Sequence, residues 1–264
     1  MARYPGGIIR STPIVPTILS APGVWTLAEA LQAKGQGIWP AVDPYFASVV
    51  ALLHMEGADT STTLTDVKGH TFTAAGNAQI DTAQSKYGSG SLLSDGTGDR
   101  VTSADHADWE LSSVDFTIEF WVRFNSVAAG NSFLVVKINN TATDFMSFGI
   151  IRSTASLRFF ASADSASFFI NDVSFAAGLA TGVWYHVAVN RTGTAWRGYI
   201  DGVGTALATS SSGIHNSAFP LCIAADNLGN NSLNGWIDEL RITKGVGRYP
   251  ANFTPPTEAF VDYA

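Results

Sequence analysis

Cysteine is nearly absent from this chain. Cys222 is the single cysteine among 264 residues, so no intramolecular disulfide can form and packing must hold the fold together. Cys222 lies in an apolar run, residues 221–224. This setting is typical of a small buried side chain and not of a reactive thiol.

Charge is also scarce, and positive charge most of all. The chain has 15 Lys and Arg against 22 Asp and Glu, which gives a net charge of −7 and a pI near 5.1. Nucleic-acid affinity depends largely on clustered Lys and Arg, and no such cluster occurs here. We therefore exclude nucleic acid as a partner.

Long apolar runs are missing as well. The longest, residues 45–53, is far shorter than the roughly 20 residues that a membrane-spanning helix needs. Pro5, Gly6, Gly7, Pro13 and Pro16 interrupt the region where a signal peptide would need a continuous apolar stretch. We expect no membrane span and no signal peptide.

Motifs for catalysis are equally absent. The five histidines show neither His-x-x-x-His nor Cys–His ligand spacing. The chain has no Gly-x-Ser-x-Gly elbow to support Ser-His-Asp catalysis. We interpret His186, within a strongly apolar strand, as a hydrogen-bonded sheet residue.

What the chain does contain is the pattern of a β protein. Hydrophobic residues make up 46% of it, and 25 glycines punctuate short segments. Residues 116–124 alternate apolar and other side chains, as a strand with one face on a core does. Further strands are predicted at 49–54, 100–103, 132–138, 146–152, 157–161, 168–173, 184–190, 196–201, 221–225 and 235–243, with turns at 191–195 and 201–202. This number of strands predicts an all-β, two-sheet antiparallel sandwich.

Residues 1–44 differ in composition and are predicted to form an extended docking arm. Six of the ten prolines fall here, and proline fits poorly inside a sheet. One short helix is expected over residues 26–35, where Thr26 and Glu29 have capping-box spacing. The apolar residues predicted to dock are Trp25, Leu27, Leu31 and Trp39.

Three segments in order resemble the laminin-G-like jelly-roll family of the concanavalin A-like lectin and glucanase superfamily. They are 116–124 (FTIEFWVRF), 183–191 (VWYHVAVNR) running to 199–202 (YIDG), and 233–242 (LNGWIDELRI). The resemblance implies a jelly-roll sandwich over residues 45–250, between the arm and a C-terminal tail of residues 251–264.

A second resemblance concerns the setting of the domain. Residues 237–249 (IDELRITKGVGRY) with 253–256 (FTPP), and the arm segments 23–27 (GVWTL) and 37–40 (GIWP), are similar to segments of tailed-bacteriophage virion proteins. This implies a virion protein, assembled in the host cytoplasm as a capsid decoration, head-fibre or tail-associated component. Its partners would be major capsid or tail proteins, and a homo-oligomer, such as a trimer, is expected.

The resemblance also bears on catalysis. Glucanases of this superfamily carry a Glu-x-Asp-x-Glu strand whose alternating carboxylates share one cleft. No such strand occurs here: Glu119 is flanked by Thr117 and Trp121, and the neighbours Asp238 and Glu239 should face opposite sides of a sheet. We expect a protein that is not an enzyme.

Two kinds of ligand are still implied by the family. Jelly-roll lectins often hold calcium, and the position of a calcium-binding carboxylate in this family matches Asp238. Asp99 and nearby carbonyls could supply further oxygen ligands. A hydrogen bond from a neighbouring turn to Asp238 is the equal alternative. A glycan-binding adhesin is the alternative function. Its candidate stacking residues are Trp109, Trp196, Tyr199 and Trp236, each of which could instead pack in the core.

Overall fold

The computed structural model describes Gln32 and residues 42–138, 147–164 and 166–263, and nearly all regular structure in these ranges is β. The strands are β1 (Val49–Leu53), β2 (Thr63–Thr65), β3 (Thr71–Ala75), β4 (Gln79–Asp81), β5 (Ser91–Asp95), β6 (Arg100–Ser103), β7 (Phe116–Phe124), β8 (Asn131–Lys137), β9 (Phe148–Ser153), β10 (Ser156–Ser162), β11 (Phe168–Ala177), β12 (Trp184–Thr192), β13 (Ala195–Ile200), β14 (Val203–Thr209), β15 (Leu221–Ile223) and β16 (Asn234–Lys244). Two short 3-10 helices, η1 (Phe46–Ser48) and η2 (Ala107–Trp109), complete the elements.

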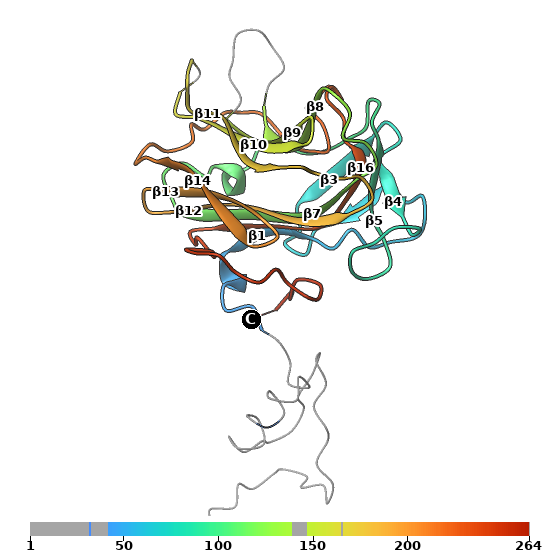
Figure 1. Cartoon of the computed structure of the whole chain (residues 1–264). Helices are drawn as coiled ribbons and strands as arrows, with labels where there is room; N and C mark the ends of the chain where they lie inside the picture. The colour runs from blue at the N-terminus through green and yellow to red at the C-terminus, as the bar shows by residue number, and fades with distance from the viewer. Residues whose placement is uncertain (1–31, 33–41, 139–146, 165, 264) are drawn as a thin grey trace, which may run out of the picture. The chain divides into compact units, whose positions relative to one another are not determined.

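The strands form two antiparallel sheets of eight strands each, which lie face to face (Figure 1). The β7 sheet has the order β14-β13-β12-β7-β16-β5-β4, and β1 pairs with β16 as well. The β8 sheet has the order β11-β10-β9-β8-β15-β6-β3-β2. The predicted two-sheet sandwich is thereby confirmed, and the long crossovers between sheets are those of a jelly roll.

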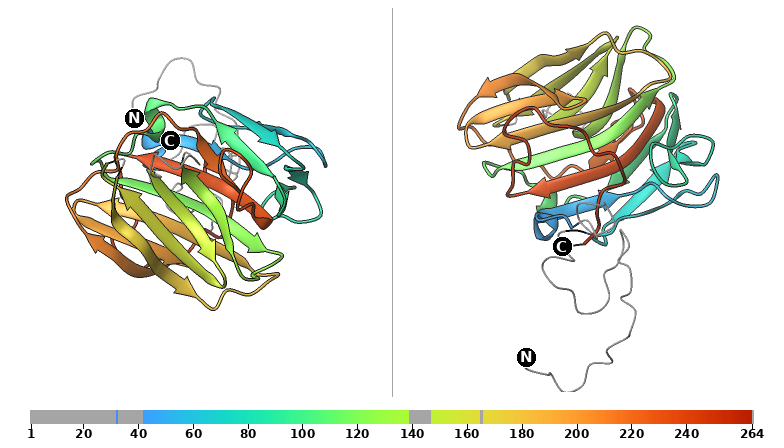
Figure 2. Two further views of the ribbon diagram at one scale, coloured as in Figure 1. Left: turned by 90° about the horizontal axis from the view of Figure 1, so that it is seen from above. Right: turned by 60° about the horizontal axis from the view of Figure 1, so that its bottom comes forward.

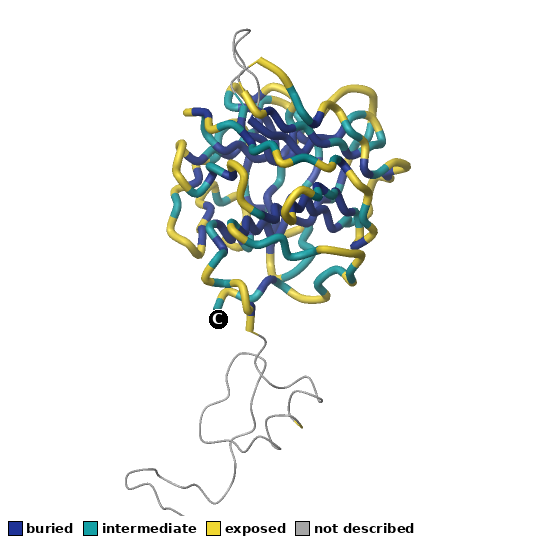
Figure 3. The backbone as a smooth tube through the Cα atoms, turned by 90° about the vertical axis from the view of Figure 1, so that its left-hand side faces the viewer, coloured by how far each residue is buried: buried dark blue, intermediate teal, exposed yellow. Residues whose placement is uncertain are grey.

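One continuous core fills the space between the sheets. The even-numbered residues of β7, from Phe116 to Phe124, point into it and are completely buried. Trp196, Phe159 and Ile237 from other strands join the same cluster. Figure 3 shows this interior as the dark blue part of the tube, with many of the exposed residues, in yellow, in the loops around it. Alternation in the sequence therefore identified the core face of the central strand.

Tight turns set the register of the β12-β13-β14 meander. Gly193 has a φ of 59° in the β12–β13 turn, and Asp201 and Gly202 have φ values of 47° and 77° in the next one. Left-handed residues in two-residue loops match the twist of antiparallel strands, which is why Asp-Gly suits this place. Both predicted turns are confirmed.

The chain divides into two units, Tyr45–Asp262 and Met1–Pro44 with Tyr263–Ala264. The sandwich is the first of these. In the second, the amide of Asp43 donates to the carbonyl of Tyr263 at 3.1 Å. Apart from Gln32, the helix predicted over 26–35 lies outside the described residues, as do Trp25, Leu27, Leu31 and Trp39. No helix in the described ranges has the length and apolarity to cross a membrane.

After β16 the chain turns back over the outside of the β7 sheet. We call residues 246–262 the C-terminal strap (Figure 2, right). The Phe253 amide donates to the Gly202 carbonyl at 3.0 Å, the Tyr87 hydroxyl donates to the Pro256 carbonyl at 2.6 Å, and the Phe260 amide donates to Glu239 at 2.8 Å. The segment expected as a tail from residue 251 thus packs on the sandwich and covers one of its faces.

Candidate functional site

The outer face of the β7 sheet carries an unusual set of polar and aromatic side chains. Strand register places Glu119 beside Ala188 of β12 and Arg241 of β16. Residues paired across antiparallel strands share a face. Each odd-numbered residue of β7 therefore forms, with its partners on β12 and β16, a row of side chains on the outer face of the sheet. The row of Trp121 includes His186 and Asp238, and the row of Arg123 includes Trp184 and Trp236.

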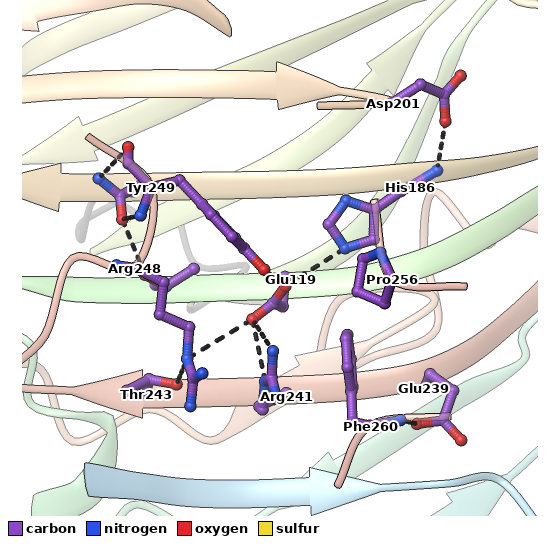
Figure 4. Close-up of polar contacts among 12 residues, drawn as sticks. Glu119, His186, Asp201, Glu239, Arg241, Thr243, Arg248, Tyr249, Pro256 and Phe260 are labelled. Carbon is purple, nitrogen blue, oxygen red and sulfur yellow. Dashed lines mark hydrogen bonds and ion pairs between the residues drawn. The ribbon is translucent and has the colours of Figure 1, made fainter. Parts of the chain in front are cut away.

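Glu119 is the centre of a buried ionic network (Figure 4). Its Oε1 accepts hydrogen bonds from Nε and Nη2 of Arg241 at 3.0 and 2.8 Å, and Nε of Arg248 lies 3.8 Å away. Its Oε2 accepts a hydrogen bond from the Tyr249 hydroxyl at 2.6 Å, and Nε2 of His186 lies 3.3 Å away. Strap and sheet therefore supply partners to both oxygens of one carboxylate.

Electrostatics keep this carboxylate ionised. Burial alone would raise the pKa of Glu119, but the guanidinium of Arg241, together with His186 and Arg248, lowers that pKa well below its usual value. The same burial, with the negative charge of Glu119 beside it, raises the pKa of Tyr249. The phenol therefore remains a proton donor to a permanent anion.

The strap seals the network from solvent. Glu119 and His186 are both 0% exposed. Tyr249 stacks on Phe253 with 3.6 Å between ring centroids, and Phe253 lies edge-on to His186 at 5.6 Å. The carboxylate of Glu119 therefore has no solvent-exposed surface, and its partners are those of a structural ion network.

A β-bulge in β16 brings the neighbouring carboxylates of Asp238 and Glu239 to the strap side. The pairing shifts between Asp238 and Arg241, and Glu239 has a φ of 51°. The expectation that the two side chains face opposite sides was wrong, because the sequence does not reveal the extra residue. Glu239 accepts hydrogen bonds from Nδ1 of His54 at 2.8 Å and from the Phe260 amide at 2.8 Å.

Asp238, the residue predicted to bind calcium, holds a turn in place. Its Oδ2 accepts hydrogen bonds from the amides of Lys86 and Tyr87 at 2.7 and 3.1 Å. Burial, opposed by these amides, raises its pKa to about 7. Its buried Oδ1 has no hydrogen-bond partner among the described residues. One free oxygen is a small part of the six to eight that calcium takes, so these contacts fit the turn better than the ion.

Asp99 has a similar role elsewhere in the fold. It is 0% exposed, and its Oδ2 accepts a hydrogen bond from the amide of Asp95 at 2.6 Å, while its Oδ1 accepts one from Asn77. Among the described residues, neither Asp99 nor Asp238 belongs to a group of three His, Cys, Asp or Glu side chains within ligand distance of one another. Calcium at these residues stays a prediction.

Three of the four residues proposed to stack on sugars are core residues. Trp109, Trp196 and Tyr199 are exposed by 2%, 0% and 0%. The indoles of Trp109 and Trp196 donate to the carbonyls of Ala104 and Ser210 at 3.0 and 3.1 Å. A buried ring offers no face to a ligand. These three side chains therefore pack in the core, which was the alternative to sugar stacking.

Trp236 differs, because its side chain is partly exposed on the outer face of the β7 sheet. With Arg123 and Trp184 it forms a row across β12, β7 and β16, which we call the tryptophan strip. All three residues are partly exposed. The guanidinium of Arg123 lies 5.0 Å from the Trp236 ring, and the Trp236 indole donates to Asp81 at 2.7 Å. Sequence reasoning missed Trp184 and Arg123, because only the pairing of distant strands places them beside Trp236.

Comparisons with known proteins agree with this fold. The family model described as the concanavalin A-like lectin/glucanases superfamily matches residues 95–246. No curated protein sequence matches the chain.

Similar solved structures are mostly binding domains. The binding domain of Paraclostridial mosquitocidal protein 1 is 16% identical with a TM-score of 0.57, and the match covers 76% of this chain and 49% of that domain. The binding domain of botulinum neurotoxin DC in complex with SialylT is 16% identical with a TM-score of 0.56, and the match covers 76% of this chain and 49% of that domain. Domain 4 of a Geobacillus stearothermophilus extracellular arabinanase, in complex with arabinotriose, is also 16% identical with a TM-score of 0.56, and the match covers 76% of this chain and 94% of that domain. This chain therefore matches about half the length of the two toxin domains, and at these identities the likeness concerns the fold.

Proposed function

Because this chain belongs to the concanavalin A-like lectin/glucanases superfamily, we propose that it is a non-enzymatic, lectin-like module that binds carbohydrate at the tryptophan strip. The observation that carries the proposal is the division of the outer face of the β7 sheet. The carboxylates of Glu119 and Glu239 are buried and bonded to the strap, whereas Trp184, Arg123 and Trp236 remain partly exposed.

The chemistry of the strip suits an oligosaccharide. Indole rings stack on the C–H faces of sugars, and β12 and β16 flank β7, which sets the two tryptophan backbones about 10 Å apart. Arg123 uses one N–H on the Gly182 carbonyl at 3.2 Å, and a guanidinium carries five such donors. Sugar hydroxyl or carboxylate oxygens are suitable acceptors for the others. Two aromatic platforms with a donor between them favour a ligand longer than one sugar.

The sealed carboxylates support a protein without hydrolase activity. Glycoside hydrolysis needs two carboxyl groups that flank a bound sugar. Glu119, Asp238 and Glu239 are 0%, 0% and 1% exposed, and Glu119 and Glu239 have hydrogen-bond partners on both sheet and strap. Their burial supports a module that does not hydrolyse sugars.

A glycan array tests the binding proposal. The full chain should bind at least one oligosaccharide class, and a Trp184→Ala/Trp236→Ala double variant should lose the signal. Leu228→Ala, which removes an exposed apolar side chain elsewhere, is the matched control and should bind normally. Repeating the array with calcium and with a chelator tests the predicted ion. Absence of binding in every condition would refute the lectin function.

The second part of the proposal concerns where the module is carried. We propose that residues 1–44 anchor it to a tailed-bacteriophage particle, as a capsid decoration, head-fibre or tail-associated protein. The proline-rich composition of this segment and the similarity of the segments containing Trp25 and Trp39 to virion proteins support it. A homo-oligomer, with a trimer as the expected form, belongs to the same proposal.

Particle composition tests the anchoring role. Mass spectrometry of purified particles should detect the chain, and its copy number per major capsid subunit would separate a shell protein from a tail or fibre component. A chain that lacks residues 2–44 should no longer join particles. Normal incorporation of the shortened chain would refute the anchor, without affecting the glycan proposal.

A further inference from the structure

The fold brings together two histidines that are far apart in the sequence. His70 lies between β2 and β3, and His106 lies between β6 and η2. Strands β3 and β6 are antiparallel neighbours, with Thr73 opposite Thr102. The residue before β3 is therefore next to the segment that follows β6, and Asp108 of η2 lies at the same place. No ligand spacing in the sequence reveals this meeting.

The three side chains converge on one point. Nε2 of His70 lies 2.9 Å from Oδ2 of Asp108, and Nδ1 of His106 lies 3.3 Å from the same oxygen. The two imidazole rings are 4.7 Å apart between centroids. One ligand atom from each of the three residues lies within 4.8 Å of the others. In a tetrahedral zinc site with bonds of about 2.0 Å, ligand atoms are about 3.3 Å apart, so small side-chain rotations bring all three into range.

One nitrogen of the cluster has two neighbours on Asp108. Nδ1 of His106 accepts a hydrogen bond from the Asp108 amide at 3.2 Å and lies 3.3 Å from Oδ2 of the same residue. A metal ion bound between this nitrogen and Oδ2 would take the place of the hydrogen bond and make a bond to each atom.

The backbone on both sides of the cluster is well fixed. Asp66 accepts hydrogen bonds from the amides of His70 and Leu52 at 3.0 and 2.7 Å, which holds the β2–β3 loop against β1. Trp109 is 2% exposed, anchors η2 and places its ring 4.7 Å from that of His70. Rigid supports lower the entropy lost when an ion is bound.

We propose that His70, His106 and Asp108 form a binding site for a zinc-class divalent ion. Two imidazole nitrogens and one carboxylate oxygen suit Zn²⁺, Co²⁺ or Ni²⁺ better than the hard ions Ca²⁺ and Mg²⁺. The side chains of His70, His106 and Asp108 are 16%, 53% and 32% exposed, so water completes the coordination. The bound ion joins the β2–β3 loop to the segment after β6 and stabilises the β8 sheet at this edge.

Calorimetric titration of the full chain, produced without an affinity tag and treated with a chelator, tests the site. One Zn²⁺ should bind per chain, and Co²⁺ should give the visible absorption of a low-symmetry site with nitrogen ligands. Zinc should also raise Tm, because an ion that binds only the folded chain stabilises it. His106→Ala and Asp108→Asn should each weaken zinc binding at least about tenfold, while both side chains are exposed enough for the fold to persist.

His215→Ala is the matched control, because His215 is a partly exposed histidine outside the cluster. Its zinc affinity should equal that of the unchanged chain. Failure of the chain to bind zinc would overturn the proposal. Equal affinity in His106→Ala, Asp108→Asn and the unchanged chain would overturn it as well, because zinc would then be bound elsewhere. Neither result depends on glycan binding.

Discussion

The outer face of the β7 sheet has two halves with opposite chemistry. Under the strap, Glu119, Arg241 and His186 are buried among aromatic rings, with Arg241 donating to Glu119 and Nε2 of His186 lying 3.3 Å from that carboxylate. One row further along the same strands, Arg123 lies between two partly exposed tryptophans. Strands β12, β7 and β16 contribute to both halves, and the strap covers one of them.

Whether the strap covers a side chain determines the role that the side chain can have. A charge taken out of water must be neutralised nearby, so the covered half carries an ion network whose members cannot be removed singly. An aromatic row left partly in water keeps apolar surface that a ligand can bury. We infer that the covered half stabilises the fold and the uncovered half recognises a ligand.

The largest effect on stability is expected from Glu119→Gln. The substitution removes the buried negative charge that Arg241, Arg248 and His186 surround, which should lower the free energy of unfolding by about 3–5 kcal/mol. Urea unfolding measures it, and Glu258→Gln, at an exposed position in the strap, is the control and should have little effect. A loss below about 1 kcal/mol would mean that the network is open to water and that the face is not sealed.

A smaller and pH-dependent effect is expected at the margin of the covered half. The hydrogen bond to Glu239, with the charges of Glu239, Asp262 and Glu56, raises the pKa of His54 above 6.5 against the opposing effect of burial. The folded state holds this proton more tightly than the unfolded state. The resulting stabilisation is complete below pH 6.5 and is lost as the pH rises through the raised folded-state pKa.

Unfolding of the unchanged chain and of His54→Gln from about pH 5 to about pH 9 checks this sign. The stability advantage of the unchanged chain should shrink with rising pH over that interval. A pH-independent difference would show that His54 titrates alike in both states, and that its contact with Glu239 carries no charge.

The smallest effect on stability is expected from Trp184→Ala, in the uncovered half. Its ring is partly exposed, so the loss should be about 1 kcal/mol by urea unfolding. Glycan binding measured on the same preparation should fall much further. A severe loss of stability with unchanged binding would reverse the roles of the two halves.

The sequence predicted what depends on local pattern. Alternation located β7 with its core face, and turn residues located the β12–β13 and β13–β14 connections. Strands β2, β3, β4, β5 and β14 were missed, because segments such as Thr71–Ala75 contain one large apolar residue and no clear alternation. Asp238 was selected by family position and Asp99 as a further oxygen ligand near it, yet the structure shows both binding backbone amides.

Features that depend on distant pairing could not be predicted. The bulge at Glu239, the strap over Glu119 and the alignment of Trp184 with Trp236 all follow from contacts between segments far apart in the chain. Burial of Trp196 and Tyr199 likewise depends on which sheet face each side chain occupies. Sequence separates the faces of one strand, and only the fold decides which face is covered.

The most direct test of the account is a nuclear magnetic resonance titration of the tryptophan indole N–H signals with the oligosaccharide that binds best on the array. Signals of Trp184 and Trp236 should shift with ligand concentration, while those of the buried Trp109 and Trp196 should stay in place. Unchanged signals from Trp184 and Trp236 at saturating ligand would contradict the central claim, because recognition would then take place away from the tryptophan strip.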